Sequence, residues 1–160
     1  AGVYRTLCEL FNTLPTYLSL CIQDPAAFRE TWRRIQALVD AFQVKTLHPT
    51  LLLSVYLGAA RGFLALGEED TALDLLEAYT DLATGDIYPL RLHGDAFFDQ
   101  LDRWMEDTLT LGRDLPRDEA LVRKSMTQAL TAHPAFAPLA DHFRFQALVG
   151  RLRANEEVAP

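Results

Sequence analysis

The side chains best suited to hold a ligand are aromatic and cationic residues in the middle of the chain. Aromatic rings can line an apolar pocket, and a guanidinium or an imidazole can supply the polar contacts that orient a bound molecule. Residues 84–94 are unusually apolar for a loop and could cover such a pocket. The candidate residues for an effector or partner pocket are Tyr56, Arg61, Tyr79, Tyr88, Arg91, His93 and Trp104. The alternative, which we favour for the rings, is that they belong to the core.

Motifs typical of catalysis or of metal binding do not occur in the sequence. The histidines are scattered, without the spacing of a metal site, at His48, His93, His133 and His142. Gly58, Gly62 and Gly67 lie in or after a predicted helix and not after a strand, which argues against a phosphate-binding loop. The acidic run at 68–70 lies at a predicted helix start, where the helix dipole favours carboxylates. We therefore predict that the chain is not an enzyme and holds no cofactor or metal.

The composition is that of one globular domain with an acidic surface. A chain of 160 residues can bury a core without metals or disulfides, and no apolar run is long enough to cross a bilayer. The net charge of −7, from 15 basic and 22 acidic residues, argues against direct binding to duplex DNA. Basic residues gather at Arg29, Arg33 and Arg34. Because Glu30 lies four residues before Arg34, we interpret this cluster as a paired, solvated helix face.

The two cysteines, Cys8 and Cys21, lie thirteen residues apart in one predicted helix, which separates them by about 20 Å. At that distance they cannot form a disulfide with each other. Both lie on or beside the apolar stripe, so we predict free, buried thiols in a cytoplasmic protein. The alternative interpretation is a redox sensor.

Residues 48–83 predict a helical hairpin around which the rest of the chain is organised. Apolar residues recur at helical spacing on both sides of Gly67, which ends the first helix. In the first helix they are Leu52, Leu53, Tyr56, Leu57, Ala60, Phe63 and Leu64. In the second they are Ala72, Leu75, Leu76, Tyr79 and Leu82, with Asp74, Glu77 and Asp81 on the other side. So short a turn makes the helices antiparallel, and Ala60 and Ala72 would let their backbones approach closely.

Two helices are predicted before the hairpin. The first, residues 3–22, contains Pro15, which should kink the helix but not split it. Its apolar stripe consists of Val3, Leu7, Leu10, Phe11, Leu14, Leu18 and Cys21. The second begins with Asp24 as a cap and Pro25 in the first turn. Its core face consists of Phe28, Trp32, Ile35, Val39 and Phe42, and residues 43–47 are predicted to be a connection.

Three further helices are predicted after the apolar loop. Asp95 would cap the first of them, which ends at Gly112, and Pro116 would open the next. The first stripe is Phe97, Phe98, Leu101, Trp104, Met105 and Leu109. The second is Leu121, Val122, Met126, Ala129 and Leu130, with Arg117, Arg123 and Lys124 exposed. After a short turn with Phe136 and Leu139, the last helix covers residues 143–152. Its predicted inward-facing residues are Phe143, Leu148, Val149 and Leu152.

These segments predict an all-α fold, an array of about seven antiparallel helices with tetratricopeptide-like helical hairpins. The hairpin resembles a tetratricopeptide unit in Tyr56, Ala60, Phe63, Gly67, Ala72, Leu76 and Tyr79, although the usual tryptophan and closing proline are missing. We predict a single helical domain at 1–154 and a frayed tail at 155–160. Because the chain begins with Ala1, we expect it to be a piece of a longer protein, and the alternative is a processed product.

Two stretches resemble bacterial regulatory proteins. Residues 92–126, with GDAFFDQLDRW followed by PRDE, resemble the C-terminal helical region of helix-turn-helix regulators of the Xre type. Residues 133–152 resemble the closing helices of tetratricopeptide-like regions in bacterial signalling and regulatory proteins. The matching residues there are Pro134, Phe136 and Leu139, followed by Arg144, Phe145 and Leu148.

The resemblance implies a regulatory, dimerisation or effector-binding domain of a bacterial transcriptional regulator. It also implies that the N-terminal DNA-binding domain is missing, since no helix pair with a polar recognition helix precedes residue 25. The expected partners are a protein, a second copy of the chain, or a small-molecule or peptide effector. DNA would be bound only through the missing domain, and no membrane partner is expected. The alternative is a stand-alone tetratricopeptide-like protein-interaction scaffold.

Overall fold

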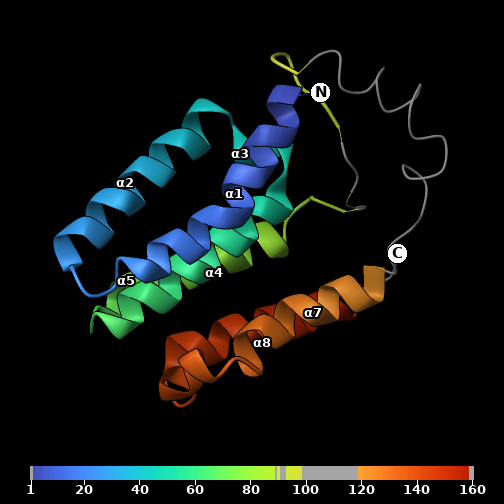
Figure 1. Ribbon diagram of the computed structural model, residues 1–160. Helices are drawn as coiled ribbons and strands as arrows, with labels where there is room; N and C mark the ends of the chain where they lie inside the picture. Colours follow the sequence, from blue (N-terminus) through green and yellow to red (C-terminus); the bar gives the residue numbers. More distant parts are fainter. Residues whose placement is uncertain (1, 89, 91–92, 99–118, 159–160) are drawn as a thin grey trace.

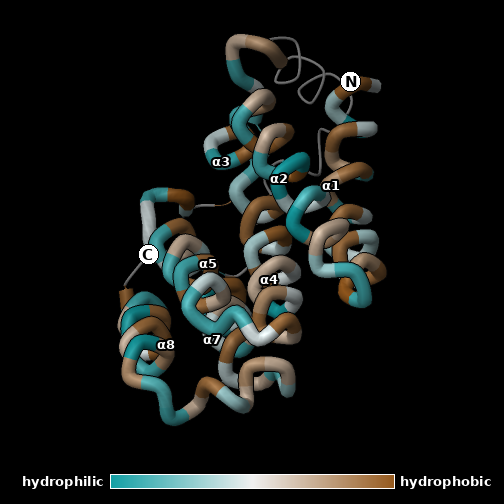
Figure 2. Tube along the Cα trace, turned by 90° about the vertical axis from the view of Figure 1, so that its left-hand side faces the viewer, coloured by the Kyte–Doolittle hydropathy of each residue, from teal (hydrophilic) through white to brown (hydrophobic). Residues whose placement is uncertain are grey.

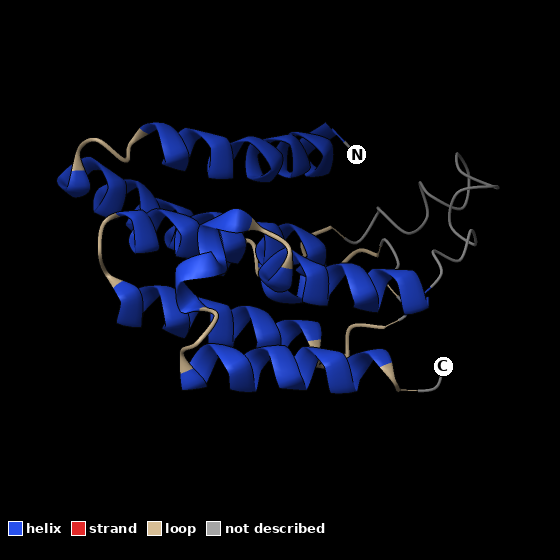
Figure 3. Cartoon of the chain, turned by 90° about the horizontal axis from the view of Figure 1, so that it is seen from below, coloured by secondary structure: helices blue, strands red, loops and turns tan. Residues whose placement is uncertain are grey.

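A computed structural model describes residues 2–88, 90, 93–98 and 119–158, and every regular element in this part of the chain is helical (Figure 1, Figure 3). The elements are α1 (Gly2–Leu20), α2 (Pro25–Ala41), α3 (Val44–Leu47), α4 (Pro49–Ala65), α5 (Glu69–Ala83), α7 (Glu119–Thr131), the 3-10 helix η1 (Pro134–Leu139) and α8 (Phe143–Glu156). The predicted all-α class is confirmed. Within the described residues, no helix combines the length and apolarity that a bilayer crossing requires.

The helices form an array with α1 along one edge and α8 along the other (Figure 2, Figure 3). α4 and α5 lie side by side in the middle, and α7 and α8 pack together beyond α5 (Figure 1). The predicted helix after Asp95 falls mostly outside the described residues, as does the predicted start at Pro116. Asp95 itself accepts hydrogen bonds from the backbone N–H groups of Phe97 and Phe98, both at 2.9 Å, as a cap would.

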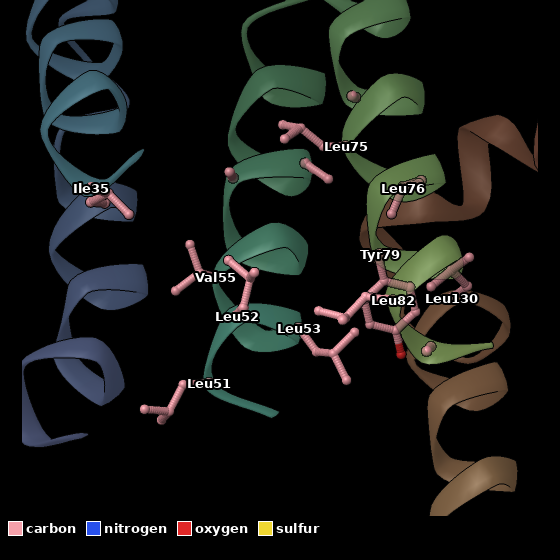
Figure 4. Packing of buried hydrophobic residues seen from close by; sticks show 14 of the residues in the cluster. Ile35, Leu51, Leu52, Leu53, Val55, Leu75, Leu76, Tyr79, Leu82 and Leu130 are labelled. Atoms are coloured by element: carbon pink, nitrogen blue, oxygen red, sulfur yellow. The ribbon is translucent and has the colours of Figure 1, made fainter. Parts of the chain in front are cut away.

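α4 and α5 form the predicted hairpin. Gly67 has a φ of 80°, the left-handed conformation that glycine adopts at the end of a helix. The N–H of Glu68 donates to the carbonyl of Phe63 at 2.9 Å and closes the turn. Ala60 and Ala72 are fully buried. Figure 4 shows leucines of both helices filling the space between α4 and α5, with Leu130 of α7 on the far side of α5.

α4 is buried on more sides than one apolar stripe would predict. Leu51, Val55 and Ala59, which the predicted stripe omits, are also buried, because α1 packs along α4 and the Phe28 ring of α2 contacts Phe63. A Cβ atom at Gly58 would lie 3.0 Å from Cβ of Pro15 in α1. α4 is therefore the central element of the fold, and its glycines mark where neighbours approach closely.

α1 continues through Pro15 without a break, as predicted, but it does not bury its whole apolar stripe. Val3 and Leu10 were predicted to be core residues, and they are 63 % and 37 % exposed. Tyr4 is buried in their place and contacts Phe98 edge to face. The buried face of α1 is thus rotated toward Tyr4, because the helix packs on α4 through Pro15 and its neighbours.

α2 begins as predicted, and Asp24 Oδ1 accepts hydrogen bonds from the N–H groups of Ala26 and Ala27 at 3.1 and 3.2 Å. Its buried residues are Phe28, Trp32 and Ile35. The predicted connection at 43–47 is wrong in detail, since residues 44–47 form the one-turn helix α3. Both ends of α3, Val44 and Leu47, are buried, so this short segment contributes to the core.

The sequence prediction differs from the structure at several positions in the C-terminal helices. Leu121 and Phe143 were predicted to be buried, and they are 64 % and 76 % exposed. Phe145 takes the core position predicted for Phe143, since two residues along a helix is a turn of about 200°. The predicted frayed tail is also wrong at its start. α8 continues to Glu156, and Asn155 is buried.

Candidate functional site

Five of the seven candidate residues can be placed, because Arg91 and Trp104 lie outside the described residues. Tyr79 and Tyr88 come together at Met126, through its carbonyl oxygen and its sulfur respectively. No hydrogen bond, ion pair or ring contact within the described ranges joins Tyr56, Arg61 or His93 to these tyrosines. The structure thus groups two of the predicted residues at Met126.

Tyr88 fixes the apolar segment that follows α5. Its hydroxyl donates to the carbonyl oxygen of Ala83 at 2.8 Å and lies 3.0 Å from Sδ of Met126. The guanidinium carbon of Arg123 lies 3.8 Å from the centroid of the Tyr88 ring, a distance typical of a cation–π contact. Tyr88 therefore packs between α5 and α7, and the described residues Ile87 and Leu90 also pack against the core, as the apolar sequence predicted.

Arg123 was predicted to be exposed, and it is buried. Its Nη1 donates to Oδ1 and to the backbone carbonyl of Asn155, at 2.7 and 3.2 Å. Its Nη2 lies 3.8 Å from the carboxylate of Glu119, one turn earlier on α7. A buried guanidinium is tolerated when hydrogen bonds satisfy it, and Asn155 provides them from the last turn of α8.

Asn155 and Tyr79 extend this arrangement to α5. Nδ2 of Asn155 donates to the carbonyl of Ala83 at 3.2 Å, so Ala83 accepts from both Asn155 and Tyr88. The Tyr79 hydroxyl donates to the carbonyl of Met126 at 2.8 Å. We call Tyr79, Tyr88, Arg123 and Asn155 the polar cluster. It connects α5, the segment after α5, α7 and α8.

The polar cluster is built to hold helices together. Burial raises the pKa of Tyr79, and the neighbouring Tyr88 adds to this effect. Burial also raises the pKa of Tyr88, so both hydroxyls stay protonated at neutral pH. Each hydroxyl proton is donated to a backbone carbonyl, and the guanidinium is engaged by Asn155. The cluster therefore positions α7 and α8 and presents no pair of a nucleophile and a base.

A second contact between α5 and α8 is made by ion pairs at the surface. Arg144 reaches Asp74 and Glu77 at 2.8 and 3.1 Å, and Arg151 reaches Asp81 at 2.7 Å. These acidic residues are the outward side of the predicted hairpin. They face the last helix and align it along α5, although exposed ion pairs contribute little stability.

The remaining candidate residues are not members of the polar cluster. Tyr56 and Arg61 are both half-buried on α4. Burial raises the pKa of Tyr56, with a contribution from the charge of Asp40, and burial lowers the pKa of Arg61. Nδ1 of His93 lies 3.0 Å from the carbonyl oxygen of Gly94, which can only accept, so this nitrogen carries the proton.

α1 carries the largest set of exposed apolar side chains among the described helices. Val3, Leu10 and Tyr17 are 63 %, 37 % and 57 % exposed, and they recur every seven residues on one side of the helix. Leu20 at the end of α1 is also exposed. Single exposed apolar residues elsewhere, such as Phe143 and Leu121, need no explanation, but a row on one helix is typical of a contact surface.

Comparisons with protein-family models, with curated proteins and with solved structures found no match. Among the described residues, no group of three or more His, Cys, Asp or Glu side chains could hold a metal ion. What is established is an all-helical protein. Its two candidate sites are the polar cluster and the exposed residues Val3, Leu10 and Tyr17 of α1, which we call the α1 row.

Sequence reasoning missed Arg123 and Asn155, although the spacing contained a signal. The buried residues of α7 are Arg123, Met126, Thr127 and Leu130, an i, i+3, i+4, i+7 stripe. In the same way Asn155 follows Leu148 and Leu152 on the buried face of α8. The sequence predicts Arg123 on the exposed side of its helix, as charged residues mostly are, and places Asn155 in a frayed tail. A polar residue on each of two antiparallel core faces could have suggested that they meet.

Proposed function

We propose that this chain is a regulatory helical domain that acts by binding another protein chain, and that it belongs to a bacterial transcriptional regulator. The observation that carries the proposal is the row of Val3, Leu10 and Tyr17 on α1, the edge helix of the array. Exposed apolar rows at the edge of a helical array are suited to pairing with another helix. The link to a regulator rests on the resemblance of residues 92–126 and 133–152.

The charges favour a protein partner over DNA. Binding to duplex comes largely from Lys and Arg side chains that neutralise phosphates. Here Arg29 pairs with Glu68, and both Arg33 and Arg34 pair with Glu30. Arg144 and Arg151 are engaged by α5 carboxylates. These five arginines already have carboxylate partners within the fold, which favours DNA contacts through a separate domain.

A stand-alone interaction scaffold is the second candidate, favoured by the antiparallel α4–α5 hairpin with small residues at its crossing. The sequence of the whole gene separates the two. A regulator should carry about 60–70 further residues with a helix-turn-helix pattern before this chain. A gene without such a region would contradict the regulator and favour the scaffold.

The DNA side of the proposal is tested by fluorescence anisotropy with a labelled, mixed-sequence duplex over a salt series. We expect no binding by this chain at physiological salt, because its net charge is −7. A protein that includes the preceding domain should bind with a steep salt dependence. Tight, salt-sensitive binding by this chain alone would overturn the assignment.

A further inference from the structure

We propose that the chain self-associates through α1, with two copies of the helix packed antiparallel about a two-fold axis at Leu10. This inference rests on the proposed function and names the partner of the α1 row as a second copy of the chain. It is carried by the exposure of the row, by its symmetry along the helix, and by the charge of the face on which it lies.

The row is symmetric about its middle residue. Val3 and Tyr17 each lie seven residues from Leu10, which is about 10.5 Å along a helix. When two copies run antiparallel about Leu10, each Val3 faces Tyr17 of the other copy and the two Leu10 side chains meet. A two-fold interface requires a surface that is complementary to itself, and this spacing supplies one. On a straight helix the row turns by only about 20° every seven residues, so one side holds all three.

The face around the row is uncharged, although the chain carries a net charge of −7. The charged residues of α1 are Arg5 and Glu9. At 100° per residue, Glu9 projects about 100° and Arg5 about 140° away from Leu10. Thr6 and Thr13 lie beside the row on its exposed flank. Two copies can therefore meet here without placing like charges opposite each other, which they could not do along the acidic face of α5.

Position and size set the strength of the contact. α1 lies at the edge of the array, on the side away from α8, so a second copy can approach without meeting α7 or α8 (Figure 2, Figure 3). A helix of 19 residues is about 28 Å long. A contact confined to one helix of each copy should bury no more than about 1,200 Å², the lower limit of standard interfaces. The dimer is therefore weak, and its population depends on protein concentration.

The test is sedimentation equilibrium of the chain over concentrations from about 1 to about 500 µM. We expect a monomer–dimer equilibrium. Leu10→Glu places two carboxylates at the axis and should raise the Kd for dimerisation at least about tenfold. The matched control is Phe143→Glu, which adds the same charge at an exposed apolar residue of α8 and should leave Kd unchanged. Circular dichroism of each variant checks that the fold is kept, and Tyr17→Glu replaces Leu10→Glu if that variant unfolds.

A charge-swap cycle tests the orientation. Val3→Lys and Tyr17→Glu should each weaken the dimer, and the double variant should recover most of the loss, because the introduced lysine then faces the introduced glutamate of the other copy. A parallel pair would place like charges together and show no recovery. A monomer throughout, equal effects of Leu10→Glu and Phe143→Glu, or no recovery in the double variant would each overturn the proposal. None of these outcomes would contradict the regulatory domain, which is tested by the gene and by the DNA titration.

Discussion

The ring of Phe28 in α2 occupies the space that a side chain at Gly62 in α4 would need. A Cβ atom at Gly62 would lie 2.2 Å from Cζ and 2.4 Å from Cε2 of Phe28. Phe28 also meets Phe63 edge to face, with ring centroids 5.0 Å apart. The close packing of α2 against the central helix therefore depends on the absence of a side chain at one position.

Gly62→Ala should destabilise the protein by about 1–3 kcal/mol, because the gain in helix propensity is outweighed by displacement of a fully buried ring. Gly150→Ala is the control, since a Cβ there has no neighbour within 4 Å. That variant should gain up to about 1 kcal/mol. Urea unfolding of both variants measures the difference, and equal stabilities would contradict the α2–α4 contact.

Asn155→Ala should cost about 2–4 kcal/mol, because it leaves the buried guanidinium of Arg123 and the carbonyl of Ala83 with fewer partners. Arg153→Ala, an exposed change in the same helix, should stay within about 0.5 kcal/mol of the parent. A chain that ends at residue 154 should lose at least as much as Asn155→Ala. Thermal unfolding compares the three, and a truncated chain with full stability would contradict a structural role for Asn155.

The carboxyl group of Glu30 should have a lower pKa than that of an ordinary glutamate. Hydrogen bonds from Arg33 and then Arg34 lower the pKa of Glu30 from 4.5 to about 2. The pKa of Glu30 is lower in the folded than in the unfolded state, so its ion pairs stabilise the fold fully at pH values above the ordinary pKa of 4.5. This stabilisation is lost as the pH falls toward 2. Carboxyl NMR titration measures the midpoint. Arg33→Gln, or about 0.5 M salt, should raise it, and an insensitive midpoint would exclude the ion pair as its cause.

Both cysteines should be free thiols. Cys8 and Cys21 are half-buried and unpaired by any disulfide. Titration of unfolded, non-reduced protein should therefore find two thiols per chain. In the folded protein burial raises the pKa of Cys8, so its alkylation near pH 8 should be slower than in the unfolded chain. Fewer than two thiols would indicate a disulfide between chains.

The sequence predicted correctly those features that depend only on residues close together in the chain. The turn at Gly67 and the cap at Asp24 depend on neighbouring residues alone, and both form as predicted. The errors occur where two faces of a helix compete. Phe143 and Phe145 are equally apolar, and Phe145 is the buried one because the fold places it beside Phe136 of η1. Tertiary contacts of this kind cannot be derived from spacing within one helix.

The candidate site was less predictable than the fold for the same reason. Tyr79 and Tyr88 were identified as aromatic residues, but their common partner is the backbone and sulfur of Met126, 47 and 38 residues away. Arg123 is buried because Asn155, 32 residues later, satisfies it. A sequence pattern cannot reveal a hydrogen bond between two helices whose relative placement is unknown, so the polar cluster emerged only from the three-dimensional arrangement.

The bond between Ala83 and Asn155 also has a consequence for synthesis on the ribosome. The two residues are 72 positions apart, and until the second emerges, α5 lacks the helix that its carboxylates and its last carbonyl require. At about 5–20 residues per second, the nascent hairpin waits roughly 4–14 s in this state. During that interval the side of α5 that packs against α8 is exposed to solvent. Completion of α8 therefore marks the moment when this side of α5 gains its cover.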